Sequence, residues 1–116
     1  SIRDQKEEQS NSAVKKAMLY IQENFSKDIS LDEVSGQVNI SPYYFSKIFK
    51  EETGENFIEY LTRIRIEKAK EFLKQPEVSV KEAGVKSGYT DPNYFSRIFK
   101  KQTDMTPSEF KTRYGK

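Results

Sequence analysis

The feature that most constrains this chain is a stretch of ten residues that occurs twice. The first copy reads SPYYFSKIFK over residues 41–50, and the second reads DPNYFSRIFK over residues 91–100. Seven of the ten positions are identical, and Lys47 is replaced conservatively by Arg97. A match this dense within 116 residues indicates an internal repeat, so the chain must build the same local structure twice.

Each copy predicts a short helix with two unlike faces. A capping residue, Ser41 or Asp91, precedes a proline, which is typical of a helix start. The apolar residues follow helical spacing and share one face: Phe45, Ile48 and Phe49 in the first copy, and Phe95, Ile98 and Phe99 in the second. The opposite face carries hydrogen-bonding and basic residues and no acid: Tyr43, Ser46, Lys47 and Lys50, then Asn93, Ser96, Arg97 and Lys100.

The sequence before each of these helices also repeats. Ser30 with Glu33, and Ser79 with Glu82, have the spacing of a capping box that opens a preceding helix. Asn39 and Gly88 then stand where a left-handed backbone would end that helix. These positions repeat with a shift of 49 instead of 50, so one extra residue precedes Pro92. The repeated unit is therefore predicted to be a helix-turn-helix.

The remaining segments complete an all-α fold of about seven helices in two helix-turn-helix subdomains. Residues 1–11 are polar and lack periodicity, so they are expected to be a linker tail. An amphipathic helix should start near Ser12 and end near Asn24, within a first subdomain of residues 12–55. Residues 56–75 hold a long linker helix whose apolar residues serve two faces, and residues 76–116 form the second subdomain, whose last helix opens at Thr106.

Composition excludes several classes of function. The chain has no cysteine and no histidine, which removes thiolate metal sites and the commonest general base. No glycine-rich phosphate loop is present, and adjacent acids point apart on helices, so neither an enzyme nor a cofactor is expected. No apolar run could span a membrane and no secretion signal is evident, which favours a cytoplasmic protein.

The two outer faces fit duplex DNA chemically. Arginine pairs with guanine, asparagine with adenine, serine with either, and a tyrosine ring contacts a thymine methyl group. Two readout helices on a rigid connector could enter successive major grooves about 34 Å apart. The candidate base-reading residues are Tyr43, Ser46, Lys47, Asn93, Ser96 and Arg97. The candidate phosphate-binding residues are Ser41, Lys50, Lys100, Lys101 and Thr106.

The chain resembles the DNA-binding region of the AraC/XylS family of bacterial transcription regulators, many of them activators. The resemblance covers about Ser12 to Tyr114 and is strongest at Gly88–Asp91, Tyr94–Lys100 and Thr106–Phe110. It implies a DNA-binding output module whose isolated form is monomeric, with RNA polymerase as a further partner. A regulatory domain, absent from this chain, would sense a signal and could make the full-length protein dimeric.

Two residues depart from the family pattern, and one alternative function stays open. Asp104 stands where a glycine is usual, and Ala83 replaces a larger aliphatic residue. Arg65 is interpreted as a partner for an acid or a carbonyl inside a helix interface, not as a base-reading residue. The alternative is a helical protein-interaction module whose basic faces dock an acidic partner such as RNA polymerase.

Overall fold

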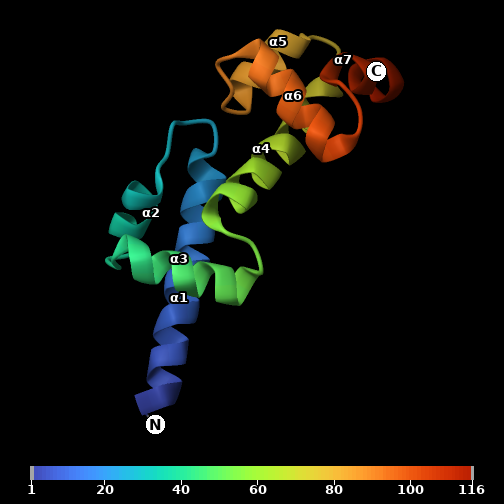
Figure 1. Cartoon of the computed structure of the whole chain (residues 1–116). Helices are drawn as coiled ribbons and strands as arrows, with labels where there is room; N and C mark the ends of the chain where they lie inside the picture. Colours follow the sequence, from blue (N-terminus) through green and yellow to red (C-terminus); the bar gives the residue numbers. More distant parts are fainter. Residues whose placement is uncertain (1, 116) are drawn as a thin grey trace. The chain divides into compact units, whose positions relative to one another are not determined.

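The computed structural model describes the backbone of residues 2–115 and the side chains of residues 11–115. Over that range the chain forms seven helices and no strand, which confirms the predicted all-α class with paired helix-turn-helix units (Figure 1). In chain order they are α1 (Ile2–Asn24), α2 (Leu31–Gln37), α3 (Pro42–Thr53), α4 (Phe57–Leu73), α5 (Val80–Lys86), α6 (Pro92–Thr103) and α7 (Pro107–Tyr114).

Helix α1 begins at Ile2, ten residues before the start expected from the apolar pattern. Residues 3–9 read RDQKEEQ, and arginine, glutamine, lysine and glutamate all have high intrinsic helix propensity. Because an amphipathic pattern detects only the buried part of a helix, it misses a polar extension of this kind. The role of residues 1–11 as a linker tail stays a prediction.

The chain divides into two compact units. The first contains the residues through Asn24 together with Asp28–Leu61, and the second contains Phe25–Lys27 together with the residues from Thr62 onward. The chain thus enters the second unit briefly between α1 and α2. Helix α4 contributes its first residues to one unit and the remainder to the other.

In the first unit, α1, α2 and α3 contact one another, with α3 lying across α1 (Figure 1). The phenylalanines of the repeat are fully buried here, as predicted, and the Phe49 ring lies edge-on to Tyr60 of α4 with 5.4 Å between ring centres. Tyr60 was not among the residues expected in this core. The Tyr20 hydroxyl donates to the Glu33 carboxylate, which ties α1 to α2, and this hydrogen bond is the main reason that the pKa of Tyr20 is raised.

The second unit has its own aromatic core. The rings of Phe95, Phe99 and Phe110 follow one another, with 5.8 Å and 5.5 Å between successive ring centres. Tyr89 stacks on Phe95 at 5.6 Å. The buried members of this core are Ile66, Ala69, Leu73, Val78, Ala83, Tyr89, Phe95, Phe99 and Phe110. Helix α4 supplies the first three, so its apolar residues do serve two cores, as their spacing predicted.

The turn in each helix-turn-helix has the predicted left-handed residue. Asn39 has φ +57° and Gly88 has φ +106°. In both units the third residue after the helix donates its backbone N–H to the carbonyl of the third-last residue of that helix: Ile40 to Ser35 at 3.1 Å, and Tyr89 to Gly84 at 2.8 Å. These bonds satisfy carbonyls that a helix end would otherwise leave without partners. The duplicated turn then sets the direction in which α3 and α6 begin.

Candidate DNA-binding surfaces

Both candidate readout helices are fixed at their starts by side-chain caps. The Ser41 hydroxyl accepts a hydrogen bond from the backbone N–H of Tyr44 at 3.3 Å. Asp91 does the same for α6, where its Oδ1 accepts from the N–H groups of Asn93 at 2.9 Å and Tyr94 at 3.4 Å. In each helix the next residue is a proline, whose fixed φ suits the first turn. The first exposed residues of α3 and α6 are therefore held by local chemistry.

Helix α3 presents its candidate base-reading residues to solvent. Tyr43 is 83% exposed, and no other large apolar side chain among the described residues is as accessible. Ser46 and Lys47 are also exposed, while Phe45 and Phe49 are fully buried on the opposite side of the helix. The structure thus places all three candidates on one accessible face.

Helix α6 presents two of its three candidates fully. Asn93 and Arg97 are exposed, whereas Ser96 is only half-buried. Ser96 lies on the wall of a groove of about 270 Å³ between α5 and α6. The groove is lined by Val80, Lys81, Gly84, Val85, Tyr89, Pro92, Phe95 and Ser96. Asn93 and Arg97 are consequently the more accessible candidates on this helix.

The candidate phosphate-binding residues differ in what surrounds them. Lys100 and Lys101 are exposed in the last turn of α6. Lys50 occupies the same place in α3, but its Nζ lies 3.8 Å from Oε1 of Glu59. The hydroxyls of Ser41 and Thr106 cap α3 and α7, and Thr106 also donates to Glu109 at 3.0 Å. Any phosphate contact at a cap would involve exposed N–H groups of the first helical turn as well.

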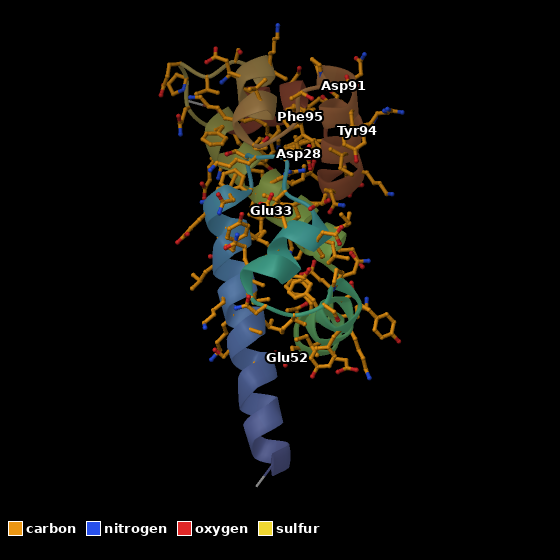
Figure 2. The ribbon with its side chains drawn as sticks, turned by 90° about the vertical axis from the view of Figure 1, so that its left-hand side faces the viewer. Asp28, Glu33, Glu52, Asp91, Tyr94 and Phe95 are labelled. Atoms are coloured by element: carbon orange, nitrogen blue, oxygen red, sulfur yellow. The ribbon has the colours of Figure 1, made fainter. Side chains whose placement is uncertain are left out.

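Acids gather at the end of α3. Burial first, and the nearby charge of Glu51 second, raise the pKa of the Glu52 carboxyl above its ordinary value. Figure 2 labels Glu52 here and Glu33 on α2. At the equivalent end of α6 the sequence has Lys101 and Gln102 instead. The same helix position is therefore acidic in one unit and basic in the other.

Tyr94 lies beside the core of the second unit, and its ring centre is 5.8 Å from that of Tyr89. Figure 2 shows Asp91, Tyr94 and Phe95 along the first turns of α6. Tyr44 holds the same position in α3, and both tyrosines remain nearly half exposed. Their partial burial beside the cores indicates a role in packing.

Arg65 is a carbonyl partner, which confirms the interpretation from sequence. Its Nε donates to the backbone oxygen of Phe25 at 2.8 Å, and a terminal nitrogen donates to that of Lys27 at 2.9 Å. Its guanidinium also lies 5.5 Å from the centre of the Tyr89 ring. Arg65 thus connects the segment after α1 to the turn before α6, within the second unit.

Sequence reasoning missed two kinds of side-chain contact at helix ends. The hydroxyls of Thr53 and Thr103 donate to the carbonyls of Phe49 at 2.7 Å and Phe99 at 2.8 Å, which closes the ends of α3 and α6. The identical threonines at the 50-residue spacing were an available signal. The second feature is Lys111, whose Nζ donates to the carbonyls of Leu73 at 3.2 Å and Gln75 at 3.0 Å.

Other kinds of site find no support in the part of the chain that the structure describes. No group of three acidic, histidine or cysteine side chains there could hold a metal ion. Among the same residues, no helix combines the length and apolar character needed to cross a bilayer.

Two units that each present a capped helix with exposed polar and basic residues define a helix-turn-helix DNA-binding module. The family model described as "Helix-turn-helix domain" matches residues 34–113. The chain belongs to this family, the AraC-type DNA-binding domains of transcription regulators.

Individual relatives agree with this assignment. The C-terminal domain of AraT, a response regulator from Geobacillus stearothermophilus, is 38% identical with a TM-score of 0.86, covering 90% of this chain and 87% of that one. A regulator in the cgkA 5′ region of Pseudoalteromonas carrageenovora is 37% identical over 90% of this chain. The regulatory protein PocR of Salmonella typhimurium is 34% identical over 87%. The chain spans 61% and 33% of these two curated relatives.

Proposed function

We propose that this chain reads a specific DNA sequence by placing α3 and α6 in successive major grooves of one duplex. The observation that carries the proposal is the accessible face of α6, where Asn93 and Arg97 are exposed directly after the cap at Asp91. The N-terminal residues of a recognition helix are the ones that contact base edges. Helix α3 offers Tyr43, Ser46 and Lys47 at equivalent positions.

The proposed contacts divide into base readout and phosphate binding. Arg97 would pair bidentately with guanine, and Asn93 with adenine. Lys100, one turn further along α6, would meet a phosphate as a point charge and carry no sequence information. Since the exposed side chains of α3 and α6 differ, the preferred site should be directional and not palindromic.

RNA polymerase is a second proposed partner. Support comes from the relatives that are described as activators, such as Btr of Bacillus subtilis, which is 35% identical over 78% of this chain. We also propose that the isolated module is monomeric, since its internal repeat already supplies two readout helices. Size measurement by light scattering, free and with one equivalent of duplex, tests this stoichiometry.

The decisive experiment compares Arg97→Ala with Lys100→Ala on a preferred duplex selected from a random library and on mismatched duplexes. We expect Arg97→Ala to cost roughly 1–3 kcal/mol on the preferred site and to relax preference at one base pair. Lys100→Ala should weaken binding to every sequence about equally and reduce the salt slope by roughly one unit.

Lys15→Ala, on the exposed surface of α1, serves as the matched control. If Arg97→Ala lost the same affinity for every duplex sequence, Arg97 would not be a base-reading residue. Failure of the unmodified chain to bind any duplex at low salt would overturn the proposed function itself.

A further inference from the structure

The two helix-turn-helix segments share a backbone plan but carry opposite charge. Residues 31–53, covering α2 and α3, hold two basic and four acidic side chains, a net charge of −2. Residues 80–103, covering α5 and α6, hold five basic and two acidic side chains, a net charge of +3. Because the helices have equal lengths in the two segments, each charge can be compared at an equivalent position.

The differences in charge lie at exposed positions, and all but one make the second segment more positive than the first. Asp32 in α2 corresponds to Lys81 in α5, and Glu51 in α3 corresponds to Lys101 in α6. All four side chains are exposed, so the core does not require either charge. The cap is the exception, since Ser41 is neutral and Asp91 is acidic. The remaining differences are Gln37 against Lys86 and Glu52 against Gln102.

The basic residues of α3 are also offset by acids of their own unit. Nζ of Lys50 lies 3.8 Å from the carboxylate of Glu59. Lys47 has Glu51 four residues later, a spacing at which opposite charges attract on a helix. A cation that already faces a carboxylate gains less from a phosphate and releases fewer counterions there.

In α6 the cations are less offset. Lys100 does have an acid four residues later, Asp104, but that residue ends the helix with φ +65°, and the described side chains show no ion pair between the two. Arg97 has Lys101 four residues later, so the two positive charges reinforce one another toward an anion. The residue equivalent to Glu59 is Glu109, whose Oε1 accepts the hydroxyl of Thr106 at 3.0 Å. Glu59 also accepts from its own cap, the N–H of Asn56 at 3.4 Å, but the same Oε1 lies 3.8 Å from Nζ of Lys50, whereas the described side chains show no such ion pair for Lys100.

We infer that the two units bind DNA unequally. The α5–α6 unit supplies most of the sequence-independent attraction to phosphate, and the α2–α3 unit engages mainly where its side chains match the bases. The inference rests on the proposed DNA-binding function. In a helix-turn-helix the first helix crosses the phosphate backbone, so Lys81 attracts the duplex where Asp32 repels it. The second unit would hold the chain on any duplex and add its own base contacts, whereas the first would bind mainly where the sequence matches.

The test uses the same residue type at the same helix position in the two copies. Lys50→Gln and Lys100→Gln are measured in the full chain by the affinity for a selected site and for a random duplex of equal length, over a series of salt concentrations. Each phosphate contact contributes about 0.9 to the slope of log affinity against log salt. We expect Lys100→Gln to lose about one unit of slope, which is roughly tenfold in affinity at 0.1 M salt.

Lys50→Gln should change the slope by less than about a third of that amount, because Glu59 already faces this lysine. Glu51→Gln should instead strengthen binding to both duplexes, since it removes an acid from α3. Lys15→Gln is the control for the loss of one exposed positive charge elsewhere. Thermal melting of each variant without DNA verifies that the fold is retained.

A loss of slope for Lys50→Gln that reaches about a third of the loss for Lys100→Gln, or exceeds it, would overturn the division between the units while leaving the proposed function intact. Absence of binding by the unmodified chain to either duplex at low salt would instead show that the proposed function is wrong. Every result of the slope comparison therefore supports or overturns the inference.

Discussion

Asp104 occupies a backbone conformation that suits glycine better. It ends α6 with φ +65°, and its N–H donates to the carbonyl of Lys100 at 2.7 Å. In the first unit Gly54 makes the same turn with φ +81° and the same bond to Lys50 at 2.9 Å. The aspartate that departs from the family pattern therefore preserves the turn, and it does so in the left-handed region that non-glycine residues enter only at a cost.

Asp104→Gly should raise the free energy of unfolding by about 0.5–1 kcal/mol, since relief of the left-handed strain exceeds the extra entropy that glycine gives the unfolded chain. Chemical denaturation without DNA measures the effect. Asn39→Gly is the matched control, and its gain should be smaller because asparagine tolerates the left-handed region well. A fall in stability for Asp104→Gly would mean that its side chain contributes more than its backbone costs.

At the scale of the element, the contact between α5 and α6 depends on the absence of a side chain at Gly84. A Cβ there would lie 2.8 Å from Cδ2 of Phe95, whose ring is buried and packed against Tyr89 and Phe99. The first unit has Ser35 at the equivalent place, also buried. The close approach of a helix backbone to a phenylalanine ring, which leaves no room for a Cβ, is therefore a feature of the second unit.

Gly84→Ala should destabilise the protein by about 1–3 kcal/mol, because the Phe95 ring must move in a closely packed core. Gly36→Ala provides the opposite case: it lies in α2 with nothing within 4 Å of its Cβ, and should stabilise by about 0.5–1 kcal/mol. Both values come from denaturant midpoints. If both substitutions moved the denaturant midpoint in the same direction, the contact with Phe95 would not explain the effect of Gly84→Ala on stability.

The elements that sequence predicted well are those specified by neighbouring residues. Ser30, Ser79 and Thr106 accept hydrogen bonds from the N–H groups of Glu33, Glu82 and Glu109 at 3.1 Å, so each capping box marks its helix correctly. The buried phenylalanines follow from spacing alone. The start of α1 at Ile2 could not be predicted in this way, because its first turns lack an apolar pattern.

Contacts between side chains on different helices could not be predicted from the sequence. Glu59 offsets Lys50 only because α4 begins beside the end of α3, and Ser96 is half-buried only because α5 forms a groove with α6. The type of a side chain indicates what it can bind, while its accessibility depends on tertiary packing. The assignment of base-reading and phosphate-binding residues therefore stays a prediction that mutants must test.

For the molecule as a whole, the division into two units predicts that damage can be confined to one of them. Gly88→Val places a branched residue at φ +106°, with a Cβ 2.8 Å from both Nε of Arg65 and the carbonyl oxygen of Phe25. All of these atoms belong to the second unit. The substitution should cost more than about 2 kcal/mol there, because branched residues are strongly disfavoured at positive φ.

Amide hydrogen exchange resolved by residue measures this effect. We expect protection to fall in α5, α6 and α7 of Gly88→Val and to persist in α2 and α3. Gly54→Val is the reciprocal variant, since it strains a turn of the first unit at φ +81° without a clash. Loss of protection throughout the chain in either variant would show that the units unfold together.

The hydrogen bonds that Arg65 and Lys111 make to backbone carbonyls can form only in a certain order while the chain is being synthesised. Arg65 binds carbonyls 40 and 38 residues earlier in the chain, and Lys111 binds carbonyls 38 and 36 residues earlier. A ribosome makes the chain from its N-terminus. The carbonyls after α1 are therefore made before Arg65, and those at the end of α4 are made before Lys111, so neither set has its side-chain partner at first. The carbonyls at the end of α4 therefore gain their lysine partner only after α7 has been made.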